Sequence, residues 1–419
     1  MPPPSKKLKI LLGCYTCAPN RGSEPGVGWN FACRIAKFHT VHAIVEAGFK
    51  ECINKYSQEH PDVVQNITFH FIPNTFFPTL RKIYPPSYYH FYRKWQKKAY
   101  EYAAELDKKE NFDLVHQITL AGYREPGYLW KLGKPYVIGP LGGFTQTNWK
   151  LLGGLSLHGI LFFSARNILN SLQKRFGFAA KHLSKHADVI IVSDNEAAAD
   201  VKKHWHRAPL LMQEVGTQLI TSAVPTARRD GEPLKVCWVG LLQPLKALNF
   251  VLHAIARCQH PVELNVVGSG EMEQKWKNLS QQLGITDKVI FHGSVPHQKV
   301  NQVMQSCHVL CVSSIKEGGT GTVVLEAMQN GLPIVCLDHC GFASVVNERI
   351  GIKIPITNRK QISKDFATAL DTLYENEELR FQMSRQILEE QKLYSWDTKI
   401  KQLCLIYDRL LNDKKSLSS

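Results

Sequence analysis

The stretch EGGTGTVVLEAMQNGLPIV, residues 317–335, decides how the chain is interpreted. Glu317 precedes a loop of glycines and threonines, and Glu326 lies inside the apolar helical run that follows. The backbone N–H groups of residues 319–322 can point at an anion where this helix begins. Carboxylates are poor phosphate ligands but good acceptors for sugar hydroxyls. The stretch therefore predicts a sugar-nucleotide site. In the alternative interpretation, Glu317 is an ordinary loop residue and Glu326 faces solvent.

The composition indicates a globular protein with an anionic partner. The chain has 419 residues, 44% hydrophobic and 21% charged, which favours two or three domains. Its net charge is +15, and residues 1–215 hold 28 Lys and Arg against 16 Asp and Glu. Such a basic half suits a phosphate-bearing substrate or an acidic membrane surface. We expect no nucleic acid partner, because no recognised binding module is present.

The cysteines indicate a reducing compartment. Eleven cysteines in a chain of this length do not form a disulfide scaffold. Cys14 and Cys17 form a lone CxxC, whereas a zinc site requires a second pair. We therefore expect reduced structural cysteines, no metal and a cytoplasmic location. The apolar stretch 151–165 is broken by glycines and falls short of a membrane-spanning helix.

Short apolar runs alternate with amphipathic ones, which predicts an α/β fold of parallel sheets covered by helices. The candidate strands are 8–13, 40–46, 67–72, 112–116, 135–138, 187–192, 234–239, 262–267, 288–291, 308–312 and 333–337. The candidate helices are 25–37, 90–109, 160–186, 245–257, 271–283, 297–306 and 322–330. Two such series predict two doubly wound domains, with an irregular boundary near 216–232.

Three further loops follow predicted strands, where open α/β sheets bind ligands. The glycines of RGSEPGVGW, residues 21–29, allow a phosphate to approach the backbone, although their spacing is not a dinucleotide fingerprint. Glu46 at the end of the second strand keeps a dinucleotide oxidoreductase as an alternative. His116 ends a strand and is either a donor or base for a ligand or a buried structural histidine. Lys246 either reaches a diphosphate or is a solvated surface lysine.

Several motifs together resemble the retaining family-4 glycosyltransferases, which have the GT-B fold. The motifs, in chain order, are CAPNRGSEPGVGW, FDLVHQITLAGYREPGYLWKLG, VIGPLGG, WVGLLQPLKAL, VVGSGEMEQKW, VIFHGSVPHQKV and SSIKEGGTGTVVLEAMQNGLPIV. The first three are similar to a branch associated with bacterial cell-surface polysaccharide synthesis. The resemblance implies two Rossmann-like domains facing a cleft, over residues 1–218 and 219–392. It also implies that residues 393–419 form a crossover helix that packs on the N-terminal domain.

The resemblance implies a role for each matching residue. Glu326 would bind the donor ribose, Glu317 the donor sugar hydroxyls, and Lys246 the diphosphate. His116 would lie beside the reacting centre. Backbone contacts to the donor would come from Gly22, Gly26, Gly28, Gly240, Gly293, Val295, Gly318, Gly319, Thr320, Gly321 and Thr322. The implied reaction retains the anomeric configuration and needs no metal, no cofactor and no protein nucleophile.

Two departures from the family pattern favour other functions. Eight residues separate the two glutamates where the family has seven, and Leu241 stands where a diphosphate-binding arginine is usual. These departures motivate a second hypothesis, a catalytically impaired scaffold of the same fold. A nucleotide-sugar epimerase of this fold is a further alternative.

The acceptor side is predicted from the basic N-terminal domain. Residues 76–100 mix aromatic rings with Lys and Arg, as expected of a surface that contacts anionic lipid. A lipid-linked saccharide or polysaccharide acceptor would fit this charge and the apolar stretch 151–165. We therefore expect peripheral contact with the inner face of the plasma membrane.

Overall fold

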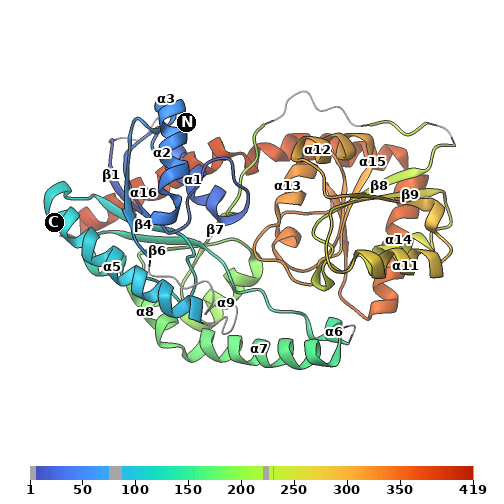
Figure 1. The fold of residues 1–419 in the computed structure, drawn as a ribbon, viewed down its shortest axis with the longest axis horizontal. Coiled ribbons are helices and arrows are strands. Elements are labelled where there is room, and N and C mark those ends of the chain that lie inside the picture. Colours follow the sequence, from blue (N-terminus) through green and yellow to red (C-terminus); the bar gives the residue numbers. More distant parts are fainter. Residues whose placement is uncertain (1–5, 75–86, 154, 220–225, 230, 419) are drawn as a thin grey trace. The chain divides into compact units, whose positions relative to one another are not determined.

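The computed structural model describes residues 6–74, 87–153, 155–219, 226–229 and 231–418, which fall into two compact units (Figure 1). Unit 1 takes the chain up to Phe144, then Ser171–Glu214, and everything from Trp396 onward. Unit 2 takes Thr145–Asn170 and Val215–Ser395. This grouping differs from the predicted division after residue 218 chiefly at residues 145–170.

The helices and strands of unit 1 alternate along the chain. They are β1 (Lys9–Cys14), α1 (Ser23–Ile35), β2 (Thr40–Glu46), η1 (Ala47–Phe49), α2 (Lys50–Glu59), α3 (Pro61–Val64), β3 (Ile67–Ile72), α5 (Ser87–Glu110), β4 (Leu114–Thr119), η2 (Leu129–Leu132), β5 (Tyr136–Leu141), α8 (Phe178–His186), β6 (Val189–Val192), α9 (Asn195–Trp205), β7 (Leu210–Leu211) and α16 (Trp396–Ser418).

Unit 2 follows the same alternation, and α7 runs from it into unit 1. The elements are α6 (Trp149–Leu152), α7 (Leu157–Phe176), β8 (Leu234–Val239), η3 (Pro244–Lys246), α10 (Asn249–Ile255), β9 (Val262–Val267), α11 (Glu273–Gln282), η4 (Thr286–Lys288), β10 (Val289–Gly293), α12 (His297–Ser306), β11 (Val309–Val312), α13 (Thr322–Gln329), β12 (Ile334–Leu337), η5 (Gly341–Ser344), β13 (Gly351–Ile354), α14 (Arg359–Glu375), α15 (Glu377–Glu390) and η6 (Gln391–Tyr394).

Each unit has one sheet, and the order of its strands creates a switch point. The sheet of unit 1 runs β3-β2-β1-β4-β5-β6-β7, and that of unit 2 runs β10-β9-β8-β11-β12-β13. The registered strand pairs of the described residues are parallel in both. The strand order reverses between β1 and β4 and between β8 and β11. Open parallel sheets bind ligands at such a switch point, beyond the carboxyl edge.

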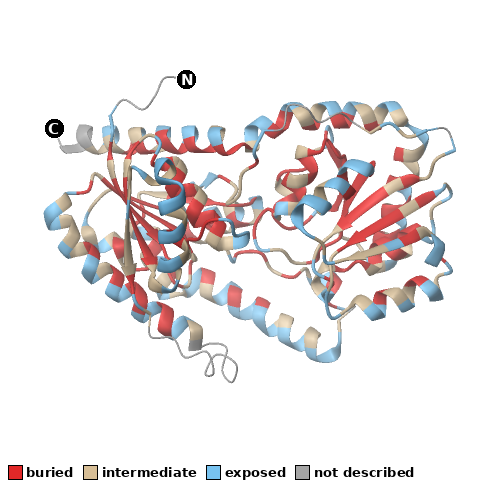
Figure 2. Ribbon diagram, turned by 45° about the horizontal axis from the view of Figure 1, so that its top comes forward, coloured by how far each residue is buried: buried red, intermediate tan, exposed pale blue. Residues whose placement is uncertain are grey.

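The cores explain why the strands read as continuous apolar runs. Strands β4, β5, β11 and β12 are buried along their whole length, as expected of parallel strands covered on both faces. Figure 2 shows the strands of both sheets largely in the colour of buried residues. The predicted α/β fold with two doubly wound sheets is confirmed.

Several elements differ from the sequence prediction, among them the short strand β7, which was not predicted. The helix expected over 160–186 is two helices, because Gly177 separates α7 from α8 with extended backbone. A Cβ there would lie 2.3 Å from the carbonyl oxygen of Gln173, so only glycine fits. Strand β13 was not predicted, since the short segment GIKI with its central lysine does not stand out from a loop.

Residues 145–170 belong to unit 2 through their own contacts. Leu151 is buried in the core of unit 2, and the Lys150 ammonium donates to the Ile356 carbonyl at 3.3 Å. His339 Nε2 lies 3.1 Å from the Gln146 carbonyl oxygen. The terminal helix α16 belongs to unit 1, where the ring of Trp396 packs edge-on against Phe31 at 5.4 Å.

The segment predicted to contact membrane lies partly outside the described residues, which resume at Ser87. The described part forms α5, and its rings at Phe91, Tyr92 and Trp95 are buried in unit 1. Trp95 Nε1 donates to the Ile72 carbonyl at 2.9 Å. These rings support the core rather than a lipid-facing surface. No helix of the described part of the chain is long and apolar enough to cross a membrane.

Candidate functional site

The loops after β8 and β11 lie side by side at the switch point of unit 2. Ile315 N donates to the Leu245 carbonyl at 2.8 Å, and the Ser313 hydroxyl donates to the Lys246 carbonyl at 2.9 Å. Trp238 Nε1 donates to the same hydroxyl at 3.0 Å. These bonds hold the two loops in register at the edge where open parallel sheets bind ligands.

Lys246 and Glu317 meet across these two loops. The Lys246 ammonium contacts Oε2 of Glu317, and the side chains are 23% and 22% exposed. The sequence assigned them separately to a diphosphate and to sugar hydroxyls, and the structure brings them together. The positive charge of Lys246 is therefore balanced by Glu317 in the unliganded protein.

The glycine-threonine loop needs its glycines for its backbone conformation. Gly319 and Gly321 have φ values of 89° and 76°, which side chains rarely adopt. Gly341 from the loop after β12 lies so close that a Cβ would be 2.2 Å from the Gly319 carbonyl oxygen. Helix α13 begins at Thr322, and its N-cap residue Gly321 makes no side-chain hydrogen bond to the first N–H groups of the helix. The loop that also carries Gly318 and Thr320 thus ends in an uncapped helix start.

Glu326 lies on the second turn of α13 and is half-buried. Burial raises the pKa of its carboxyl above the ordinary value of 4.5, and the nearby charge of His297 opposes this rise. Ionising the carboxylate is therefore unfavourable until a hydrogen-bond donor approaches it. The hydroxyls of a ribose are such donors.

Backbone hydrogen bonds at three glycines join the carboxyl ends of β8, β9 and β10. Gly240 N donates to the Val267 carbonyl at 3.0 Å, and Gly268 N donates to the Gly293 carbonyl at 2.8 Å. Gly268 has φ 136°, and a Cβ there would lie 1.9 Å from the Gly240 carbonyl oxygen. This close packing places the backbone around Gly293 and the half-buried Val295 at the edge that carries Lys246.

Leu241, directly after Gly240, is 58% exposed. It is the residue that replaces the expected diphosphate-binding arginine. A large exposed side chain at the carboxyl edge of β8 contributes no charge to this site.

His116 is fully buried in unit 1. Its Nδ1 lies 2.6 Å from the Tyr407 hydroxyl of α16, and its Nε2 lies 2.8 Å from the Gly139 carbonyl oxygen. Burial lowers the pKa of this imidazole to about 4, so the ring is neutral at physiological pH. Both ring nitrogens are engaged, and this geometry favours the structural alternative over the predicted catalytic role.

The glycines after β1 shape the second switch point. A Cβ on Gly26 would lie 2.0 Å from the Arg21 carbonyl oxygen, and one on Gly28 would lie 2.2 Å from that of Thr16. Around Gly22, by contrast, no atom lies within 4 Å of a Cβ position. The loop is therefore compact at two glycines and open at the first.

Sequence reasoning missed the role of Glu24 in this loop. Its Oε1 accepts from the Leu120 N–H at 2.5 Å and so joins the loops after β1 and β4. Burial raises the pKa of this carboxyl. The sequence signal is its place between the glycines of RGSEPGVGW, directly before the predicted helix 25–37.

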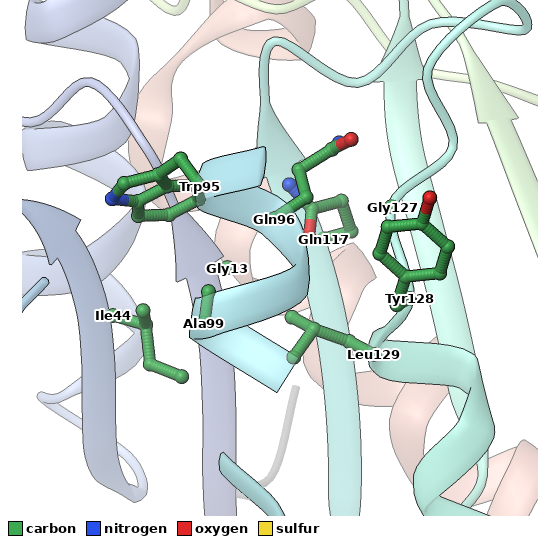
Figure 3. A pocket seen from close by; sticks show the side chains of 9 residues that line it. All are labelled: Gly13, Ile44, Trp95, Gln96, Ala99, Gln117, Gly127, Tyr128 and Leu129. Carbon is green, nitrogen blue, oxygen red and sulfur yellow. The ribbon is translucent and has the colours of Figure 1, made fainter. Parts of the chain in front are cut away.

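A small pocket in unit 1 lies between α5 and the sheet (Figure 3). Trp95, Gln96 and Ala99 of α5 line it opposite Gly13 and Gln117. None of the predicted site residues lines this pocket. The Gln96 and Gln117 amides donate to backbone carbonyls, so the polar groups serve the fold. Among the described residues, no group of three or more His, Cys, Asp or Glu side chains is placed to hold a metal ion.

Residues 223–389 match the family model described as "Glycosyl transferases group 1". This part of the chain is similar to that family. The match covers the loops that carry Lys246, Glu317 and Glu326. A curated relative is the D-inositol 3-phosphate glycosyltransferase of Corynebacterium efficiens, 26% identical over 249 residues, or 54% of this chain and 58% of that protein. The chain thus spans little more than half the length of the curated relative that it matches.

Solved structures of similar fold cover nearly the whole chain. Sucrose-phosphate synthase from Thermosynechococcus elongatus superposes with a TM-score of 0.65 at 16% identity, over 97% of this chain and 100% of that one. Anabaena HepE in complex with UDP-glucose gives 0.54 at 16% identity, over 95% and 99%. The predicted GT-B architecture of two Rossmann-like units is confirmed.

Proposed function

We propose that the protein is a glycosyltransferase that moves a sugar from a nucleoside diphosphate sugar to a lipid-linked or polysaccharide acceptor. The observation that carries the proposal is the pairing of Lys246 with Glu317 at the switch point of unit 2. This cation and this acid stand beside an uncapped helix start, which suits an anion flanked by hydroxyl groups. The group 1 family match over the same loops and the UDP-glucose in the HepE structure support a nucleotide-sugar donor.

In the proposed reaction the donor rearranges the ion pair. The Lys246 ammonium turns from Glu317 to the diphosphate, and the N–H groups at the start of α13 hold the other phosphate oxygens. The freed Glu317 carboxylate accepts from hydroxyls of the donor sugar, and Glu326 accepts from the ribose. Charge that develops on the leaving diphosphate is then stabilised by Lys246 and the helix dipole.

We further propose that transfer retains the anomeric configuration, proceeds from the same face without a protein nucleophile and requires no metal. The basic N-terminal half suits a phosphate-bearing lipid-linked acceptor at the inner face of the plasma membrane. This assignment rests on the resemblance of the motifs and on charge.

The test is release of sugar from a panel of UDP, GDP, ADP and CDP sugars, with and without a polyprenyl-diphosphate saccharide. We expect one donor to be consumed faster with acceptor, in EDTA as well as Mg²⁺, and proton NMR to give a product with the donor's anomeric configuration. Conversion of the donor into its epimer without an acceptor would instead identify an epimerase.

A catalytically impaired scaffold is the second candidate, and exposed Leu241 favours it. A missing cation on the leaving group would cost a few kcal/mol of transition-state stabilisation, by analogy with loss of one oxyanion donor at about 3–4 kcal/mol. This candidate predicts nucleotide binding without turnover of any donor. Leu241→Arg would then raise the rate of sugar release.

A further inference from the structure

Helix α7 presents its apolar side outward. Its exposed large apolar side chains are 51–74% exposed and comprise Leu157, Leu161, Phe162, Ile168, Leu169, Leu172 and Phe176. Most recur at intervals of four or seven residues, which places them on one face of the helix. Figure 1 draws α7 as one unbroken helix, so this face is continuous. The next helix begins with Phe178, which is also exposed.

The opposite face of α7 carries three buried polar side chains. Asn167, Asn170 and Lys174 recur at intervals of three and four, and all three are buried. The Asn167 amide donates to the Thr147 carbonyl at 2.7 Å within unit 2. The Lys174 ammonium pairs with Asp200 and donates to a backbone carbonyl within unit 1. These bonds fix which face points inward.

This arrangement reverses the usual amphipathic helix, which buries its apolar stripe. Apolar surface left in water is unfavourable in proportion to its area, and patches of this extent mark interaction sites. The apolar face of α7 therefore indicates an interaction site for an apolar partner. Since α7 is not apolar enough to cross a membrane, it would have to lie in the plane of one.

The charge around this face identifies the partner. Residues 148–187 contain no Asp or Glu and include six Lys and Arg. Five of these cations are exposed, and they are Lys150, Arg166, Arg175, Lys181 and Lys185. A second copy of the chain would bring two such cationic rims together, which is unfavourable. A bilayer with anionic headgroups offers apolar tails for the rings and negative charge for the rim.

We propose that α7 is an in-plane membrane-binding helix that inserts its apolar face into an anionic lipid surface. Leu161, Ile168 and Leu172 enter the acyl region, and Arg166 and Arg175 contact headgroups. The inference goes beyond the proposed transferase activity and does not depend on it. It also differs from the segment 76–100 that the sequence indicated, where Phe91, Tyr92 and Trp95 are buried in unit 1.

The test is co-sedimentation with phosphatidylcholine vesicles that contain or lack about 30% phosphatidylglycerol. We expect wild type to bind the anionic vesicles and to lose affinity at high salt, because salt screens the headgroup charge. Ile168→Glu/Leu172→Glu should lower the partition coefficient by at least ~10-fold, since two apolar side chains leave the acyl layer. Arg166→Glu/Arg175→Glu should abolish the preference for anionic lipid.

The matched control is Ile290→Glu/Leu393→Glu, which places the same charges at exposed aliphatic residues outside α7. This control should bind vesicles as wild type does, and circular dichroism should show all variants folded. Equal binding by the α7 variant and the control would overturn the proposal. A dimer in solution that Ile168→Glu/Leu172→Glu dissociates would overturn it as well, and would assign the face to a second copy.

Discussion

The Lys246 ammonium contacts the Glu317 carboxylate and so joins two loops whose residues are 71 positions apart in sequence. A diphosphate that binds Lys246 must displace this carboxylate. We therefore predict that Glu317→Gln strengthens binding of the bare nucleoside diphosphate, by roughly 3- to 10-fold for a partly exposed pair of about 1 kcal/mol. The same change should slow transfer, because Glu317 no longer accepts from the donor sugar. Calorimetry measures the affinity, and initial rates measure the transfer. If the affinity and the transfer rate fall equally, Lys246 does not exchange Glu317 for the diphosphate.

Lys246→Ala should act in the opposite direction. Loss of a charged hydrogen bond to phosphate is expected to weaken nucleoside diphosphate binding by about 10-fold or more, or 1.5–3 kcal/mol. The double variant with Glu317→Gln should bind as Lys246→Ala does, because Glu317 then has no cation to withhold. If the changes in binding free energy of the two single variants add up in the double variant, the two side chains act independently.

Glu326→Gln should raise the free energy of unfolding and weaken nucleotide binding. Burial raises the folded-state pKa of this carboxyl above 4.5, so the folded protein binds more protons than the unfolded chain. Its unfavourable contribution therefore grows as pH rises from the unfolded pKa through the folded one and persists at pH 7. Glutamine removes it, while ribose loses a charged acceptor. Urea denaturation of both proteins at pH 4–8 would measure this, and a lower stability of the variant at pH 7 would contradict it.

The hydrogen bond between Tyr407 and His116 predicts a structural role for the histidine. Tyr407→Phe leaves a buried ring nitrogen without its partner and should lower the free energy of unfolding by about 1–3 kcal/mol. The kcat of the folded fraction should stay unchanged. A large fall in kcat with unaltered stability would restore the catalytic assignment of His116.

The contribution of His116 to the stability of the folded protein should depend on pH. Its pKa falls from 6.5 to about 4 on folding, so stability is lost as pH drops through this window, when only the unfolded chain takes up the proton. A His116→Gln variant lacks this loss. The stability gap between wild type and variant should therefore shrink by about 2 kcal/mol between pH 6.5 and 5. A constant gap would show that the folded protein takes up this proton as readily as the unfolded chain does.

Gly268→Ala tests the packing of the β8 and β9 ends. The new Cβ would lie 1.9 Å from the Gly240 carbonyl oxygen, at a φ that alanine does not favour. We expect a loss of at least about 2 kcal/mol of stability and weaker nucleotide binding. Gly284→Ala is the matched control, since it also has positive φ but no atom within 4 Å. If Gly268→Ala and Gly284→Ala lose the same stability, the effect comes from backbone strain alone.

The fold could be predicted because each strand carries its own local signal. Strands 40–46, 67–72, 234–239 and 262–267 have the predicted bounds, since buried parallel strands read as apolar runs between turns. Contacts between distant residues gave no such signal. The meeting of Lys246 with Glu317 and of His116 with Tyr407 depends on strand order, which periodicity does not encode. The outward apolar face of α7 was missed because its pattern suits a buried face equally well.

The most direct measurement is the unfolding temperature with UDP, GDP, ADP, CDP and NAD, in wild type, Glu326→Ala and the exposed control Glu389→Ala. A ligand at 100 times its dissociation constant adds about 2.7 kcal/mol of stability. The account predicts a rise with one nucleoside diphosphate in wild type and in Glu389→Ala, and none in Glu326→Ala. No rise with any diphosphate, or an equal rise in Glu326→Ala, would contradict a donor site at the start of α13.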